Sequence, residues 1–182
     1  MLLCKILISV FIQCVMLPNI VTGAWALRDV TIDIEPPVVE RGETALLRCN
    51  YELEGKPLYS VKWYRGQREF YRYTPNEVPT TKVFLFAGLQ VNLQLSDEHQ
   101  VVLQNVDFNL SGNFTCEVST DGPNFLTAMV SRNMSVVVLP KYPPTLTTER
   151  GDYGIGDTIR ANCTSAASKP AATLIFSLNN MV

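Results

Sequence analysis

The strongest constraint in this chain is a set of three residues, Cys49, Trp63 and Cys116. Trp63 follows Cys49 by 14 residues, and Cys116 lies 67 residues after Cys49. Because successive side chains of a strand point to opposite faces, strands here would present all three on inner faces with apolar neighbours. Those neighbours are Ala45, Leu47, Tyr51, Val61, Phe114 and Val118. The spacing therefore predicts three strands that direct one disulfide and one indole into a common core.

From Asp29 onward, short runs with a period of two are rich in Val, Leu, Thr and Tyr and are separated by Gly, Pro and Asn. This periodicity predicts strands rather than helices. The predicted strands cover 29–34, 44–51, 58–64, 69–73, 82–86, 90–95, 100–106, 113–119 and 125–138. With the cysteine and tryptophan pattern, they predict an all-β immunoglobulin sandwich. The wide cysteine spacing leaves room for two extra strands between Trp63 and Asp97, which favours a variable-type over a constant-type domain.

Two residues depart from the usual Asp-x-Gly-x-Tyr-x-Cys segment of such domains. Leu110 stands in place of the Asp, and Phe114 stands in place of the Tyr. Phe114 has no phenol to form the tyrosine-corner hydrogen bond. Arg65, at the end of the third core strand, is expected to lack its common acidic partner. The core pattern is intact, so we expect the fold to survive.

The N-terminus has the pattern of a secretory signal peptide. Residues 6–17 are almost continuously apolar, follow Lys5 and end at Pro18 before small residues. The alternatives are a buried helix or a membrane anchor, but about 12 apolar residues are too few for a bilayer core that needs roughly 20. We assign residues 1–23 to the signal peptide, with cleavage as late as residue 26, and predict a secreted, extracellular protein that associates with a membrane only through a partner or a further C-terminal region.

Export changes the interpretation of the cysteines, because an oxidising compartment favours disulfides over metal-binding thiols. Cys4 and Cys14 would leave with the signal peptide, so the mature chain would keep Cys49, Cys116 and Cys163. The prediction is a Cys49–Cys116 disulfide.

The chain carries 15 Lys and Arg against 17 Asp and Glu. It therefore lacks the excess of basic residues that would indicate nucleic acid as a partner.

A second domain is predicted to begin after the first. Residues 27–139 form the variable-type domain, 140–144 are a Pro-rich linker, and 145–182 begin another immunoglobulin domain. Gly156 to Cys163 resembles Gly42 to Cys49, and Phe176 follows Cys163 at the spacing of a core aromatic. A sandwich needs about 100 residues, so we expect this second domain to be truncated. The alternative is a disordered tail with Cys163 as an unpaired or intermolecular thiol.

Several segments together resemble the beaten path family of insect neuronal immunoglobulin proteins. The most specific is the block from Leu58 to Tyr73, and the others are Leu27–Val30, Cys49–Gly55, Ser111–Gly112, Cys116–Ser119 and Met134–Pro140. The resemblance implies two tandem immunoglobulin domains, secreted or membrane-tethered. It also implies a role in axon guidance and motor-axon defasciculation, through heterophilic binding to immunoglobulin receptors of the sidestep family.

The stretch 62–73 contains a mixture of basic and aromatic residues, for which two interpretations are open. About half of these side chains would be core by parity, and the rest would form an ordinary solvated sheet face. Alternatively they form a partner-binding face, since Tyr and Arg are enriched at binding hot spots. Phe125, in the loop 120–125, would either anchor a partner or cap the core edge. The candidate contact residues are Lys62, Tyr64, Tyr71, Tyr73, Glu117 and Phe125.

Four Asn-x-Ser/Thr sequons, at Asn109, Asn113, Asn133 and Asn162, are candidate glycosylation sites if the chain is exported. Asn109 and Asn113 are too close together for reliable modification of both.

An enzyme is not expected. The single histidine, His99, has no visible catalytic partner, and the sequence contains no phosphate-binding loop or spaced metal-ligand cluster. We therefore predict no catalytic residues, no metal site and no cofactor.

Recognition of a protein partner is the predicted activity. The same sheet face would also serve a homophilic adhesion or co-receptor module, through contact between identical surfaces. A soluble immune or carbohydrate-binding protein is a third alternative.

Overall fold

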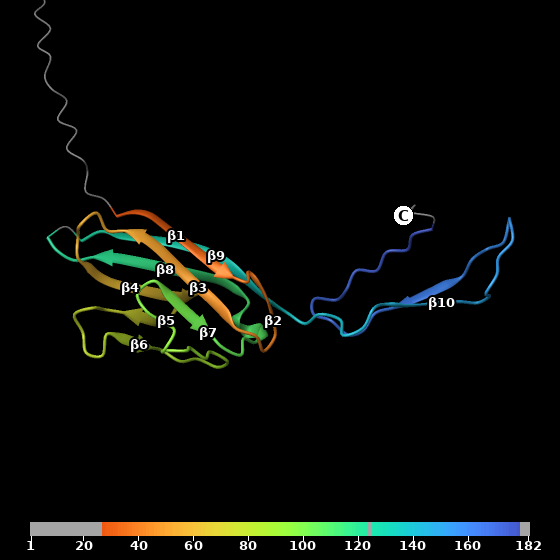
Figure 1. Ribbon diagram of the computed structural model, residues 1–182, viewed down its shortest axis with the longest axis horizontal. Coiled ribbons are helices and arrows are strands. Elements are labelled where there is room, and N and C mark those ends of the chain that lie inside the picture. The colour runs from red at the N-terminus through yellow and green to blue at the C-terminus, as the bar shows by residue number, and fades with distance from the viewer. Residues whose placement is uncertain (1–26, 124, 179–182) are drawn as a thin grey trace, which may run out of the picture.

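The computed structural model describes residues 27–123 and 125–178, so the predicted signal peptide lies outside the described residues. The regular secondary structure of the described residues is almost entirely β-strand (Figure 1). They are β1 Arg28–Glu35, β2 Val38–Glu40, β3 Ala45–Glu52, β4 Leu58–Arg65, β5 Arg68–Tyr73, β6 Thr81–Val83, β7 Gln100–Leu103, β8 Gly112–Thr120, β9 Thr127–Val137, β10 Thr145–Thr148 and β11 Ala161–Thr164, with one 3₁₀ turn at Phe108–Leu110. The predicted all-β class is confirmed.

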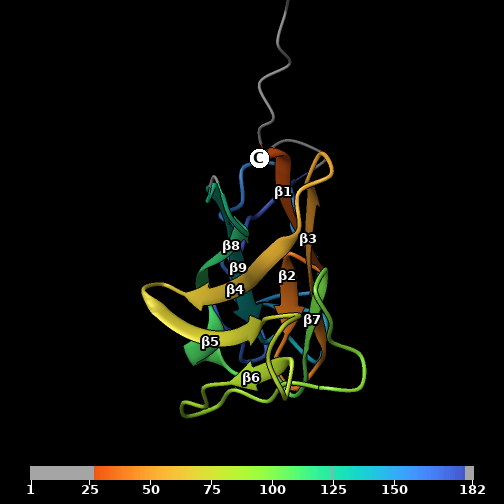
Figure 2. The same ribbon diagram turned by 90° about the vertical axis from the view of Figure 1, so that its left-hand side faces the viewer.

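Residues 28–137 form two packed layers (Figure 2). A six-stranded sheet has the order β2-β9-β8-β4-β5-β6, and a three-stranded sheet has the order β1-β3-β7. The short strand β2 pairs in parallel with β9, whereas the neighbouring pairs are antiparallel. The strands β5 and β6 extend the larger sheet beyond β4, as predicted for a variable-type sandwich.

The core forms where the alternation predicted it. Cys49 of β3 and Cys116 of β8 are joined by a disulfide and are fully buried. Trp63 is the register partner of Cys116 in the β4–β8 ladder and is also fully buried. The indole therefore lies beside the bond that connects the two sheets, as the sequence predicted.

One predicted strand, 90–95, does not form. Only a single bridge between Val91 and Leu103 is present there. The Asn92 side chain accepts a hydrogen bond from the Gln94 backbone, and the Ser96 hydroxyl donates to the Asn92 carbonyl. Such local bonds compete with a sheet ladder, which accounts for the turns found here. Strand β2 was not predicted, because its three residues are too few for a visible alternation.

As expected, no ion pair joins Arg65 to an acidic side chain within the described residues, and backbone carbonyls take the place of the missing acid. Its guanidinium donates to the carbonyl oxygens of Leu110 at 3.1 Å and Asn109 at 3.3 Å, and also to that of Ser111. The Phe114 ring is buried and packs edge-on against Phe70, with 5.9 Å between ring centroids. Backbone acceptors for Arg65 and the packing of the Phe114 ring thus replace the hydrogen bonds that the usual Asp and Tyr would make.

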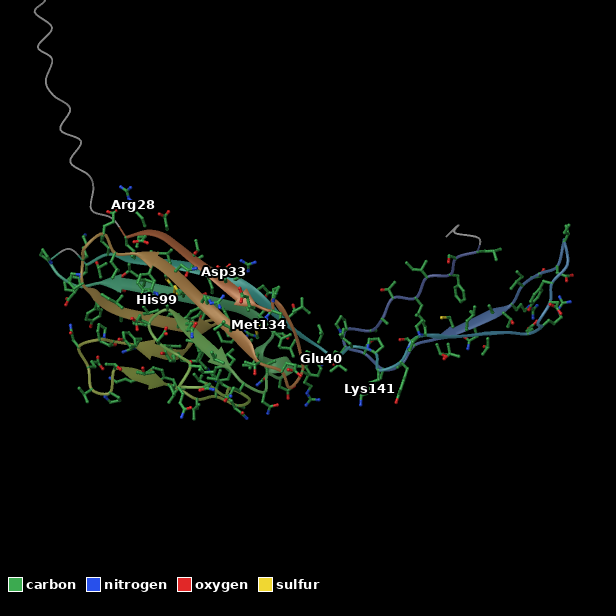
Figure 3. The ribbon with its side chains drawn as sticks, in the orientation of Figure 1. Arg28, Asp33, Glu40, His99, Met134 and Lys141 are labelled. Atoms are coloured by element: carbon green, nitrogen blue, oxygen red, sulfur yellow. A yellow bond between two sulfur atoms is a disulfide. The ribbon has the colours of Figure 1, made fainter. Side chains whose placement is uncertain are left out.

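The chain after β9 leaves the sandwich and runs away from it (Figure 1). Glu40, the last residue of β2, lies at the end of the sandwich where the Pro-rich linker 140–144, called the connector below, leaves it with Lys141 (Figure 3). Strands β10 and β11 pair with each other, with Leu146 opposite Cys163. Cys163 is an unpaired cysteine, and Phe176 is exposed rather than enclosed in a core. Within the described residues, no helix is long and apolar enough to cross a membrane.

Candidate partner-binding face

The outer face of the six-stranded sheet carries one row of side chains across five strands. Residues paired in register lie on the same face of a sheet. Lys62 of β4 is paired with Glu117 of β8 on one side and Arg72 of β5 on the other. Glu117 is in turn paired with Met129 of β9, and Arg72 with Lys82 of β6. The row therefore places two predicted residues, Lys62 and Glu117, side by side.

Glu117 is the centre of a hydrogen-bonded group on this face. Its Oε1 accepts from Lys62 Nζ at 2.8 Å, and its Oε2 accepts from the Tyr64 hydroxyl at 3.0 Å. Partial burial, together with the hydrogen bond to the Glu117 carboxylate, raises the pKa of Tyr64 to about 12. The Tyr64 phenol therefore stays protonated and donating over the physiological range.

A second ion pair lies beside this group. Arg72 donates two hydrogen bonds to the Glu69 carboxylate, from Nε at 2.7 Å and from Nη2 at 2.9 Å. Lys82 pairs with Glu77 farther along the same sheet. The Arg72 guanidinium also lies 5.7 Å from the centroid of the Phe84 ring. The charged side chains of the row are thus held in place by neighbours of opposite sign.

Tyr71 does not belong to this face, which corrects the prediction from parity. It is fully buried, because it is the register partner of Trp63 and shares the inner face with the indole. Its hydroxyl donates to the Asp97 carbonyl at 2.9 Å. A register shift between Trp63 and Tyr64 leaves Phe70 as an extra residue in β5, so Phe70 and Tyr71 are both buried.

Tyr73 is also separated from Lys62 and Tyr64. It is paired with Val61, whose side chain is buried, and it is half-buried near Glu98 at the end of the strand. Burial and the Glu98 carboxylate raise the pKa of Tyr73. The structure therefore brings Lys62, Tyr64 and Glu117 together and places Tyr73 elsewhere.

Phe125 is exposed and has an aromatic neighbour that sequence analysis missed. Its side chain is 68% exposed, so it does not cap the core. Tyr59 of β4 contacts it edge-on, with 6.3 Å between centroids. Alternation from Trp63 would turn Tyr59 inward, but a register shift between Leu58 and Ser60 turns it outward. The exposed Met129 was missed as well, because its position beside Glu117 depends on the pairing of β8 with β9.

The sequons occupy exposed positions near the connector end of β8 and β9 and in β11. Asn113 and Asn133 are direct register partners. Because Asn113 lies four residues before Glu117 in one strand, both side chains project from the same outer face. Asn109 donates through its side-chain amide to the Ala87 carbonyl, and Asn162 lies in the separate β10–β11 pair.

His99 stacks on the Tyr51 ring, with centroids 4.8 Å apart. Among the described residues, no group of three or more His, Cys, Asp or Glu side chains is arranged to hold a metal ion.

Comparisons with known proteins agree with this architecture. A family model described as an immunoglobulin domain matches residues 29–138, more than half of the chain. The crystal structure of murine CEACAM1b is similar over 75% of this chain and 67% of that chain, with 20% identity and a TM-score of 0.60. The structure of a mouse coronavirus receptor-binding domain complexed with its murine receptor is similar over the same shares, with 21% identity and a TM-score of 0.56. None of the curated proteins compared matches the chain. At these identities, the likeness concerns the fold alone.

Proposed function

Because the chain belongs to the immunoglobulin domain family, we propose that it is a recognition protein that binds another protein through the outer face of its six-stranded sheet. Domains of this family are typical of cell-surface recognition and adhesion, and they are typically not enzymes. One of the similar solved structures is a receptor in complex with a protein that binds it, which agrees with a protein partner.

The observation that carries this proposal is the shared carboxylate of Glu117. It holds Lys62 and Tyr64 in defined positions, and Arg72 is held in the same way by Glu69. Side chains that are already ordered lose little conformational entropy when a partner docks. The face also exposes Met129, while Tyr59 and Phe125 are exposed at its loop end. Aromatic residues, Met and Arg are enriched in protein interfaces, so this composition suits a protein partner.

The resemblance to the beaten path family supplies a finer proposal. In it, the chain is secreted or held at the cell surface and binds a sidestep-like immunoglobulin receptor on another cell, in axon guidance and motor-axon defasciculation. Residues 27–139 would be the binding domain, and residues 145–182 would belong to a second immunoglobulin domain. Several weak contacts at a cell junction would then combine into stable attachment.

A homophilic adhesion module is the second candidate, because a neutral, internally paired face is compatible with a copy of itself. The paired Lys62 and Glu117 would exchange partners across a two-fold axis in such a contact. Sedimentation of the purified chain at micromolar concentration separates the two candidates. A dimer that is lost in a Lys62→Ala, Tyr64→Ala variant favours self-association. A monomer favours a different partner.

The proposal is tested by binding of the secreted chain to cells that each display one neuronal immunoglobulin receptor, sidestep-like receptors included. The test variant is Lys62→Ala with Tyr64→Ala. The matched control is Arg48→Ala, which removes an exposed ion pair with Glu35 from the opposite sheet. We expect saturable binding that the control retains and the test variant loses, with both variants folded by thermal unfolding.

Equal binding by the test variant would contradict the proposed face. Binding to no receptor by the folded chain would contradict heterophilic recognition of this receptor class. Retention on immobilised glycans in place of any protein would favour a carbohydrate-binding role.

A further inference from the structure

A cavity of about 610 Å³ opens at the end of the sandwich where three segments meet. One wall comes from the end of β3 and the loop to β4, the second from the end of β5, and the third from the residues just before β7. His99, labelled in Figure 3, lies in the third wall. The residues that line this cavity are not part of the outer sheet face proposed above as the partner-binding surface.

Aromatic rings line much of the cavity. Tyr51 and His99 stack with an interplanar angle of 30°, and Tyr73 stands on the neighbouring wall. The Tyr51 hydroxyl donates to the Glu98 carbonyl at 3.4 Å, which links two of the walls. Leu53 and Leu58 add apolar surface. Such walls offer ring faces to a planar cation and apolar contact to the stem that carries it.

The charge of the lining is negative. Among the described residues that line the cavity, Glu52, Glu54 and Glu98 are acidic and none is Lys or Arg. Glu54 is engaged by Arg28 at 3.2 Å, so Glu52 and Glu98 supply most of the remaining charge. Burial raises the pKa of the Tyr51 phenol, and the carboxylates of Glu98 and Asp97 raise it further, which agrees with a negative potential at the rings.

We propose that this cavity binds an arginine side chain of a protein partner. A guanidinium stacks on aromatic rings and donates several hydrogen bonds to carboxylates in a fixed planar geometry, whereas an ammonium is a compact, strongly hydrated charge. The cavity therefore suits arginine better than lysine.

The exposed aromatic side chains next to the cavity indicate that this guanidinium belongs to a protein. Pro57 and Leu58 of its lining lead directly to Tyr59, whose ring contacts the exposed Phe125. The Asp121 backbone donates to the Pro57 carbonyl at 2.9 Å, so the loop that carries Phe125 is joined to the cavity wall. A partner that covers the two exposed rings would place a flanking arginine over the cavity.

The test is a titration of the full secreted chain with acetyl-arginine N-methylamide, observed by proton NMR. His99 is the only histidine in the chain, so its two ring C–H signals report on the cavity without ambiguity. The same titration with acetyl-lysine N-methylamide and acetyl-glutamine N-methylamide separates guanidinium recognition from general charge and from amide contacts. The pH stays at 7.5, and the titration is repeated at higher salt.

We expect saturable shifts of the His99 signals with the arginine probe, weaker shifts with lysine and none with glutamine. A Glu52→Gln, Glu98→Gln variant should lose affinity about fivefold, because it removes two carboxylates that pair with the guanidinium. The matched control Glu40→Gln, next to the connector, should bind as the parent does (Figure 3). Should the double variant fail to fold, Glu98→Gln alone serves the same purpose.

Equal shifts with lysine would overturn the assignment to arginine, and equal shifts with glutamine would overturn cation recognition altogether. Unchanged affinity of the Glu52→Gln, Glu98→Gln variant for the arginine probe would also overturn cation recognition. The Lys62→Ala, Tyr64→Ala variant leaves the cavity intact, so this result is independent of the outcome for the sheet face.

Discussion

The guanidinium of Arg65 lies directly over Gly112. A β-carbon added at Gly112 would stand 2.7 Å from Arg65 Nη2, and Gly112 has a φ of +132°. The same guanidinium is held by three backbone carbonyls, so it cannot move aside without losing hydrogen bonds. Gly112 is therefore required both for its backbone conformation and for the space that Arg65 occupies.

From this relationship we predict that Gly112→Ala lowers the free energy of unfolding by about 2–3 kcal/mol, as the sum of backbone strain and displaced hydrogen bonds. The control is Gly66→Ala. Gly66 has a φ of +62° but no atom within 4 Å of an added β-carbon, so only strain of about 1–2 kcal/mol applies. Urea unfolding measures both. In an Arg65→Ala background the cost of Gly112→Ala should fall by about 1 kcal/mol, the part due to displaced hydrogen bonds, and an unchanged cost would refute the role of Arg65.

Tyr71 should matter for stability and not for binding. Tyr71→Phe removes the hydrogen bond to the Asp97 carbonyl and should cost about 0.5–1.5 kcal/mol, because the ring still fills the core. Partner binding should be unchanged, since the side chain is buried. Tyr59→Phe, at an exposed ring, is the stability control. Loss of binding in folded Tyr71→Phe would restore the interpretation of Tyr71 as a contact residue.

Alkaline pH should destabilise the fold. Burial raises the pKa of Tyr71 to about 12, against about 10 in an unfolded chain. The folded state therefore favours the protonated phenol, and this contribution is complete below about pH 10 and lost as the pH rises towards about 12. Urea unfolding between these values should show declining stability, with a shallower decline in Tyr71→Phe. Identical slopes for the two proteins would contradict this origin.

Glycan occupancy should differ among the sequons if the chain passes through a secretory pathway. The Asn109 amide donates to Ala87 and lies against Gly88, so a sugar on its nitrogen would displace that loop. Asn113 and Asn133 are exposed on the sheet face. Glycopeptide mass spectrometry of protein from eukaryotic cells should therefore find the lowest occupancy at Asn109. If glycan occupancy is instead highest at Asn109, the hydrogen bond from its amide to Ala87 does not hinder glycosylation.

The interior was largely predictable because a repeat of two depends only on local sequence. Alternation around Cys49, Trp63 and Cys116 was enough to predict the disulfide, the buried indole and the three strands that carry them. The site was less predictable. Lys62, Tyr64 and Glu117 were expected on one face and are found there, while Tyr71 was expected on that face and is buried.

What the sequence determined by itself was therefore the all-β class, the variable-type spacing and the core around the disulfide, since these follow from local period and composition. What only the tertiary structure decided was register. The shift between Trp63 and Tyr64 turns Tyr71 inward, and the shift between Leu58 and Ser60 turns Tyr59 outward. An extra residue in a strand shows itself only against the neighbouring strand, because the ladder of hydrogen bonds belongs to the pair. The same holds for Arg65, whose acceptors are backbone atoms that no residue type reveals.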